Sequence, residues 1–142
     1  MPAQGGEAVE TTKDGLETRE SEDGKWLCFS RPLNTPDNKT AILKMPVGGG
    51  PETLVFKGVT NRFWALAGQH LYFMDLDAKL HATLNRFNLT TRQISRISDV
   101  EREPYWIFGW TSFSVSPNGA EIIYPQIDVD VSRIMLVENF RW

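Results

Sequence analysis

The sequence lacks the features that define several common protein classes. It holds a single cysteine, Cys28, so no internal disulfide can form and the chain is not a small disulfide-framed secreted domain. Its apolar runs fall short of the roughly 18 residues that a membrane-spanning helix needs. The first twenty residues are polar and contain no apolar core of a signal peptide. We therefore expect no membrane span in this chain. The compartment stays open, with a periplasmic location expected if the parent protein is exported or membrane-anchored.

Positive charge is also sparse along the chain. The formal net charge is −3, and Lys and Arg never form a run longer than two. Because phosphate binding draws on clustered Lys and Arg side chains, we expect no nucleic-acid partner.

The sequence lacks the motifs of common reaction and metal sites as well. No Gly-x-Ser-x-Gly is present, and the nearest stretch, GWTSF at 109–113, has threonine at its centre. His70 and His81 lie eleven residues apart without a cysteine pair, which argues against a zinc site. The aspartate pairs at 75/77 and 128/130 lack the glycine and glutamate of an EF-hand loop. We therefore expect no enzymatic activity, no metal and no other cofactor.

What the sequence does contain is a repeated pattern. Its 142 residues are 41% hydrophobic and 23% charged, which suits a soluble chain with a sizeable core. A glycine turn followed by a short apolar run occurs around Gly24, Gly68 and Gly119. Each is a predicted hairpin, because glycine supplies the positive φ that tight turns need. The spacings of 44 and 51 residues between these glycines are typical of propeller blades with four short strands.

The predicted fold class is all-β, a partial β-propeller of about three four-stranded antiparallel blades. The predicted units are an outer strand of a preceding blade at 1–15, blades at 16–58 and 59–100, and a final blade without its outer strand at 101–142. Segment 77–87 competes with this assignment, because Leu80, Leu84 and Phe87 have helical spacing. The repeat favours a loop and a strand there.

Several short motifs add a family resemblance. SPNG at 116–119 and ESEDGKW at 20–26 resemble the Ser-Pro-Asp-Gly turn of TolB-like, or WD40-like, bacterial β-propellers. MPVGGG at 45–50 resembles the link between the third and fourth strands of such a blade, and residues 126–141 are similar to the tail of one bacterial group. The middle unit departs from the pattern, because ALAG at 65–68 has no Ser-Pro-Asp. The resemblance implies a propeller scaffold, commonly a sensory or protein-binding module.

We interpret the chain as a non-enzymatic scaffold for protein–protein interaction, from the C-terminal portion of a bacterial sensory, regulatory or envelope protein. Binding residues concentrate on loops that a rigid sheet positions, and the candidate loops are 31–40 and 99–105. The predicted binding residues are Arg31, Asn34, Asp37, Asn38, Tyr105 and Trp106. Trp106, Phe108 and Trp110 alternate along one predicted strand, where packing between blades is favoured over a stacking platform.

Three alternatives stay open. In the first, the chain is the noncatalytic propeller part of a peptidase-like hydrolase. In the second, it is a truncated fragment without independent function, and its open sheet edges favour aggregation. In the third, two chains self-associate through their open blade edges and close one ring, with segment 8–12 of each completing the last blade of the other.

Overall fold

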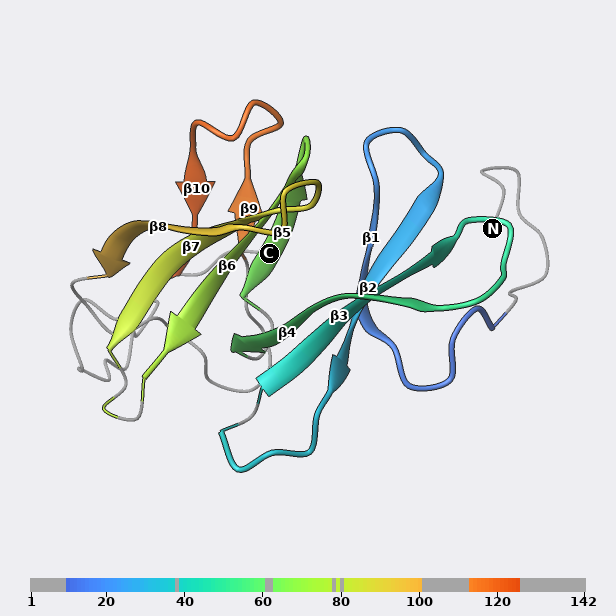
Figure 1. Cartoon of the computed structure of the whole chain (residues 1–142), viewed down its shortest axis with the longest axis horizontal. Helices are drawn as coiled ribbons and strands as arrows, with labels where there is room; N and C mark the ends of the chain where they lie inside the picture. Colours follow the sequence, from blue (N-terminus) through green and yellow to red (C-terminus); the bar gives the residue numbers. More distant parts are fainter. Residues whose placement is uncertain are drawn as a thin grey trace, which may run out of the picture.

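The computed structural model describes residues 10–37, 39–60, 63–77, 79, 81–100 and 113–125. Within these ranges the chain consists of antiparallel strands, turns and loops, and it contains no helix, so the all-β prediction is confirmed. It follows that no described helix is long and apolar enough to cross a membrane. Figure 1 shows two sheets beside each other and a small hairpin next to the second one.

Both sheets are four-stranded antiparallel meanders with strands in sequence order. The first contains β1 (Leu16–Glu20), β2 (Trp26–Pro32), β3 (Lys39–Pro46) and β4 (Thr53–Thr60). The second contains β5 (Trp64–Ala67), β6 (His70–Leu76), β7 (Ala82–Asn88) and β8 (Ile94–Val100). The hairpin pairs β9 (Ser114–Val115) with β10 (Ile122–Ile123). Neither sheet closes on itself, so β1, β4, β5 and β8 are edge strands among the described elements.

The sheets occupy residues 16–60 and 64–100, against predicted blades at 16–58 and 59–100. Their arrangement as propeller blades stays a prediction. Residues 10–15 of the predicted preceding strand contain no strand, and residues 1–9 lie outside the described ranges. Of the predicted final unit, the structure describes the hairpin region, residues 113–125.

The turn between β1 and β2 is closed by a serine and an aspartate. The Ser21 hydroxyl donates to Asp23 Oδ1 at 2.7 Å and accepts the backbone N–H of Trp26 at 3.0 Å. Gly24 then adopts a φ of 67°, a conformation in which a Cβ atom is disfavoured. The first predicted glycine turn is therefore confirmed.

The turn between β9 and β10 repeats this arrangement. The Ser116 hydroxyl donates to Asn118 Oδ1 at 2.7 Å and accepts the backbone N–H of Glu121 at 2.9 Å. Gly119 has a φ of 70°. The middle turn is shorter. Strands β5 and β6 pair as far as Ala67 and His70, so only two residues form the turn, and Gly68 has a φ of 52°. The missing serine of the middle unit thus corresponds to a different, tighter turn.

The described residues of segment 77–87 form a turn and the strand β7, as the repeat predicted, whereas Leu80 of the competing helical pattern lies outside the described residues. Asp77 Oδ1 accepts the backbone N–H groups of Lys79 and His81, which reverses the chain before β7. β7 then pairs with β6 on one side and β8 on the other. Leu84 and Phe87 pack in different core clusters, because residues three apart on a strand face opposite sides.

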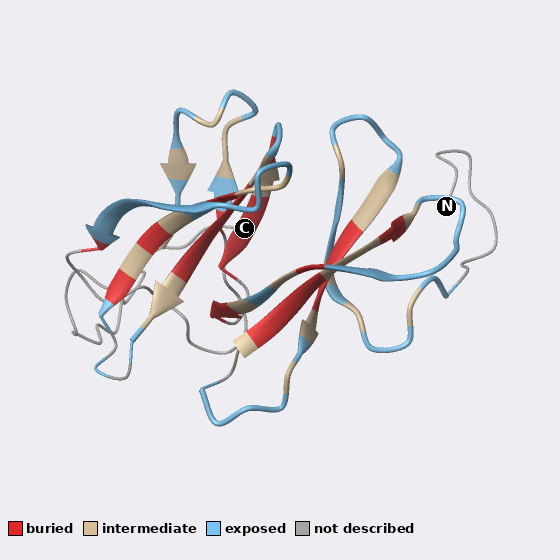
Figure 2. Ribbon diagram, viewed as in Figure 1, coloured by how far each residue is buried: buried red, intermediate tan, exposed pale blue. Residues whose placement is uncertain are grey.

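Two apolar clusters hold the sheets together (Figure 2). The inter-sheet core lies between the first and second sheets and contains Cys28, Ile42, Val55, Val59, Trp64, Leu71, Phe73 and Phe87. The hairpin core includes Tyr72 and Met74 of the second sheet, with Val115 and Ile122 of the hairpin packed against it. Strand β6 serves both cores, because its side chains alternate between the two faces. The second sheet is therefore covered on both sides.

Strand β8 is exposed along almost its whole length. All of its residues except Val100 are exposed, and Ile94 and Ile97 are 58% and 44% accessible. Since β8 is an edge strand, no further described strand covers it.

Candidate functional site

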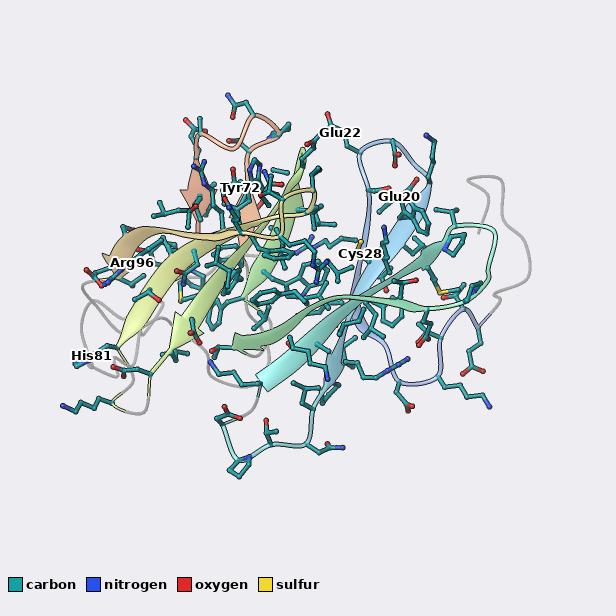
Figure 3. All side chains as sticks on the ribbon, viewed as in Figure 1. Glu20, Glu22, Cys28, Tyr72, His81 and Arg96 are labelled. Atoms are coloured by element: carbon teal, nitrogen blue, oxygen red, sulfur yellow. The ribbon has the colours of Figure 1, made fainter. Side chains whose placement is uncertain are left out.

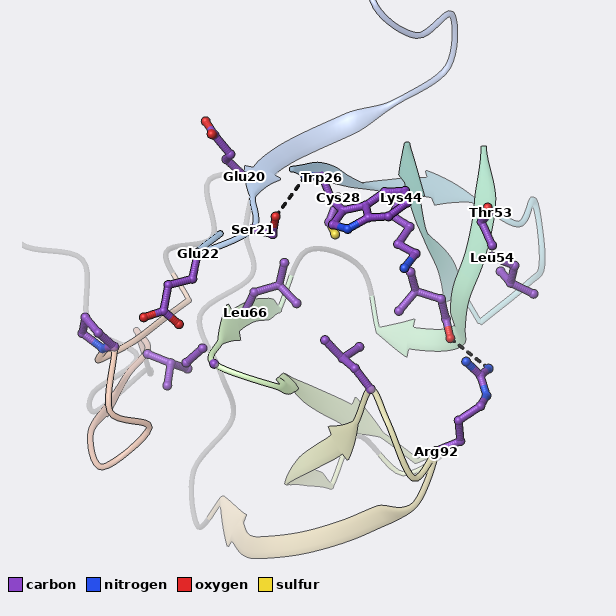
Figure 4. Close-up of a pocket in the computed structure, with 16 residues that line it drawn as sticks. Glu20, Ser21, Glu22, Trp26, Cys28, Lys44, Thr53, Leu54, Leu66 and Arg92 are labelled. Carbon is purple, nitrogen blue, oxygen red and sulfur yellow. Dashed lines mark hydrogen bonds between the residues drawn. The ribbon is translucent and has the colours of Figure 1, made fainter. Parts of the chain in front are cut away.

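A cleft of about 600 Å³ opens between the two sheets at the end where the glycine turns lie (Figure 4). Its walls come from all four strands of the first sheet, from β5 and the β7–β8 turn of the second, and from the start of the hairpin. This volume lies within the range of ligand sites in proteins. We call this feature the inter-sheet cleft.

The wall of the cleft nearest the core is apolar. It is formed by Cys28, Val55, Leu66, Leu89 and Val115, and the first two are buried. Burial raises the pKa of the Cys28 thiol, although Lys44 opposes this shift. The thiol therefore stays protonated at neutral pH, so this wall offers apolar contact rather than a nucleophile.

Lys44 forms the first part of a basic side. Its ammonium nitrogen lies 4.2 Å from the centroid of the Trp26 ring, and both residues line the cleft. A cation over an indole face is attracted by the negative face of the ring. The ring therefore holds a positive charge beside the apolar wall.

Arg92 forms the second part of the basic side and links the two sheets. Its Nη2 donates to the carbonyl oxygen of Val55 in β4 at 3.1 Å, and its guanidinium carbon lies 5.2 Å from the Phe87 ring centroid. Its backbone φ is 58°, which is unfavourable for a residue with a Cβ atom. A guanidinium has five N–H donors, so one bond to Val55 leaves it able to donate to a ligand.

The opposite side of the cleft is acidic. Glu20 ends β1 and Glu22 lies in the β1–β2 turn, and both line the cleft. Figure 4 shows Glu22 on the side of the cleft opposite Arg92, whereas the Glu20 side chain, at the rim, points away from the cleft. Among the described residues, none of the side chains of Glu20, Glu22, Lys44 and Arg92 takes part in a salt bridge. The cleft therefore has an apolar middle between separated negative and positive sides.

Arg31, the first predicted binding residue, is engaged within the first sheet. Its guanidinium makes two bonds to the Glu52 carboxylate, at 2.8 Å and 2.9 Å, and lies 5.6 Å from the Phe29 ring centroid. The hydrogen bonds raise the pKa of Arg31 and lower that of Glu52. The pair covers the face of the first sheet that is turned away from the second.

Asn34 and Asp37 lie in the loop between β2 and β3, at the other end of the first sheet from the cleft. Asn34 has a φ of 53°, and both residues are exposed. A hydrogen bond from the Thr35 hydroxyl lowers the pKa of Asp37. The predicted residues Asn38, Tyr105 and Trp106 lie outside the described residues, as do Phe108 and Trp110.

The aspartates weighed as metal ligands are bound internally where the structure describes them. Lys39 of the first sheet pairs with Asp75 of the second, and Asp77 closes the turn before β7 with its other oxygen 3.2 Å from His81 Nδ1. Figure 3 shows His81 at this far end of the second sheet. Within the described ranges, no three His, Cys, Asp or Glu side chains are placed to hold a metal ion. Asp128 and Asp130 are outside those ranges.

Comparisons of the chain with protein-family models, with curated proteins and with solved structures found no match.

The residues of the inter-sheet cleft were not among the binding residues predicted from the sequence. Three of them, Glu20, Glu22 and Trp26, flank the first glycine turn, and Arg92 lies in the β7–β8 turn. In consecutive meanders the β1–β2 turn and the β7–β8 turn lie at the same end of their sheets. This shared position is the signal that could have placed their residues in one site. Lys44 carried no such signal, because its position depends on pairing between β2 and β3.

Proposed function

We propose that the chain is part of a β-propeller-type scaffold that binds another protein and has no enzymatic activity of its own. The observation that supports this most directly is the stacking of two consecutive four-stranded meanders through one inter-sheet core. Propeller blades are antiparallel sheets of this strand order, each packed against the next.

The hairpin extends the same arrangement. Its serine turn has the hydrogen bonds of the first turn, and Val115 and Ile122 pack on the face of the second sheet opposite to the first sheet. This is the place that a third blade would occupy. The hairpin would form the first two strands of that blade.

The chemistry of the described residues favours binding over catalysis. The Cys28 thiol is buried and protonated, and Asp75 and Asp77 are held by internal partners. The inter-sheet cleft, in contrast, presents unpaired charges around an apolar wall. Such a combination recognises a ligand but offers no activated nucleophile.

A selection of random linear peptides displayed on phage, with the folded chain immobilised, tests this proposal. We expect an enriched group of related peptides that bind the folded chain and lose binding when the chain is unfolded in urea. Absence of enrichment, or equal enrichment on the unfolded chain, contradicts the proposal. Competition between these peptides and substitutions in loop 33–37 or in the cleft then locates the binding surface.

A further inference from the structure

We propose that the inter-sheet cleft binds an extended peptide whose apolar side chain is flanked by an acidic residue on one side and a basic residue on the other. The acidic residue is directed to Lys44 and Arg92, and the basic residue to Glu22. This inference rests on the proposed function and adds the site and the class of ligand.

The apolar wall sets the requirement for an apolar side chain. Leu66, Leu89 and Val115 reach the cleft from three different segments, and Val55 continues the wall into the buried core. Covering this surface removes it from water, which favours association in proportion to the apolar area buried. A polar or small side chain at this point of the peptide would leave that surface wet.

The basic side sets the position of a carboxylate. Lys44 stands over Trp26 at 4.2 Å, so the ring limits where its ammonium group can move. Arg92 is fixed by its bond to Val55 and keeps further N–H donors. A carboxylate between them would replace water on two cations with charge-assisted hydrogen bonds.

The backbone of Arg92 adds an independent argument. The turn between β3 and β4 places Gly49 and Gly50 at positive φ, whereas the turn between β7 and β8 places Arg92 there. A residue with a Cβ atom is strained in this conformation, whereas glycine adopts it readily. The chain therefore carries a guanidinium at the rim of the cleft where glycine is the less strained choice.

The acidic side orients the ligand. Glu22 lies across the cleft from Arg92 (Figure 4), and like charges repel at close range. A peptide with acidic residues on both flanks would meet this repulsion. A peptide with one acidic and one basic flank satisfies both sides.

Two edge strands favour a peptide over a compact small molecule. Thr53, Leu54 and Val55 of β4 and Leu66 and Ala67 of β5 line the cleft, and both strands are edges of their sheets. Edge strands present backbone N–H and C=O groups that an extended peptide can pair with. The bond from Arg92 to the Val55 carbonyl shows that this edge accepts a donor from outside its sheet.

Titration of the full chain with acetyl-Lys-Ala-Leu-Ala-Asp-amide, followed by backbone amide NMR, tests the inference. Versions with one alanine fewer or more on each side cover the unknown spacing. We expect the largest shifts at residues 20–26, 53–55, 66–68 and 89–92. Replacing the leucine with serine should abolish binding, and Lys44→Glu should weaken it about tenfold.

A charge exchange separates recognition from loss of structure. A peptide with lysine in place of its aspartate should bind the Lys44→Glu chain better than the original peptide does. The matched control is Lys57→Glu, which makes the same charge change on β4 outside the cleft and should leave binding unchanged. If Lys44→Glu unfolds the chain, Arg92→Gly serves as the second variant, with the same expected loss of affinity.

Three outcomes overturn the inference: no peptide of the series shifts the cleft amides, Lys57→Glu weakens binding as much as Lys44→Glu, or the shifts concentrate in loop 33–37. In the last case the proposed function stands and only the assignment of the cleft fails. The proposed function itself fails if the display selection enriches no peptide that requires the folded chain.

Discussion

The first and second sheets share strand order but bury their faces differently. The second sheet packs against the first on one face and against the hairpin on the other. The first sheet packs against the second on one face, while the Arg31–Glu52 pair and the segment around Gly15 lie over Phe29 on the other. A repeated backbone can therefore be completed either by a neighbouring sheet or by local side chains.

The turns of the two sheets differ in the same way. The first sheet joins its last two strands through Gly49 and Gly50, and the second joins them through Arg92. The backbone path needs positive φ in both, but only the second gains a side chain that reaches across to β4. Equivalent positions of a repeat thus share their conformation and differ in the contacts that they add.

The largest expected loss of stability comes from removing a buried phenylalanine ring, and it tests how firmly each sheet face is covered. Phe73 in the second sheet and Phe29 in the first are both buried, and Phe73 contacts Phe56 with ring centroids 4.8 Å apart. Phe73→Ala should destabilise by about 3–5 kcal/mol, and Phe29→Ala by less, because a segment and an ion pair can settle into the space more easily than a sheet. Urea unfolding measures both. The control is Ile94→Ala at an exposed position, which should change the free energy of unfolding by no more than about 0.5 kcal/mol. Equal losses of stability at Phe29 and Phe73 would show that their coverings are equally rigid.

The glycine turns provide the next test. Alanine at Gly24 or Gly68 should cost about 1–2 kcal/mol, because the φ is positive at each. Gly119→Ala should cost more, since its Cβ would clash with the Tyr72 hydroxyl. Gly48→Ala is the control, with open space around it and no positive φ. Thermal unfolding of the four variants gives the order, and a Gly119→Ala chain as stable as Gly68→Ala would contradict the close packing of the hairpin on β6.

Two substitutions of Arg92 separate the stability gained from its hydrogen bond to Val55 from the stability lost to its strained backbone. Arg92→Ala loses the bond to Val55 and keeps the strained backbone, whereas Arg92→Gly loses the bond and relieves the strain. The glycine variant should therefore be more stable than the alanine variant by about 1 kcal/mol. The free energies of unfolding in urea check this order, and the reverse order would show that the turn does not need positive φ.

The smallest expected effect is a pH dependence of the first sheet. The Arg31 guanidinium lowers the pKa of Glu52 below its ordinary value of 4.5. A lowered folded-state pKa contributes stability above the ordinary value, and this contribution is lost as the pH falls through the lowered pKa. Glu52→Gln should flatten the fall in stability below about pH 4.5, as measured by thermal unfolding across pH. Arg31→Gln should flatten it equally, and an additive effect in the double variant would mean that the two groups do not act as a pair.

Strands and turns were predictable because their causes are local. Glycine at 24, 68 and 119 marks the turns directly, and the repeat identified β7 although Leu84 and Phe87 have helical spacing. The cleft was not predictable by these rules. Lys44 and Arg92 come together only when β4 of one sheet meets the β7–β8 turn of the other. In the sequence each is an ordinary charged residue.

Arg31 shows the same limit from the other side. Its place beside a polar loop predicts a binding residue, which stays a prediction, and its long side chain reaches Glu52, 21 residues later in the sequence. A contact over that separation depends on how three strands align. Local pattern therefore places the residue on its strand and leaves its partner undetermined.

The strand order of the sheets has a consequence for synthesis. Every strand pair in the described structure joins strands consecutive in the sequence, so each new strand finds its partner already made. Such short loop closures favour fast folding and suit growth of the protein from its N-terminus on the ribosome. The first meander can form before the second is translated. Its apolar face is then buried when the second sheet leaves the ribosome and packs against it.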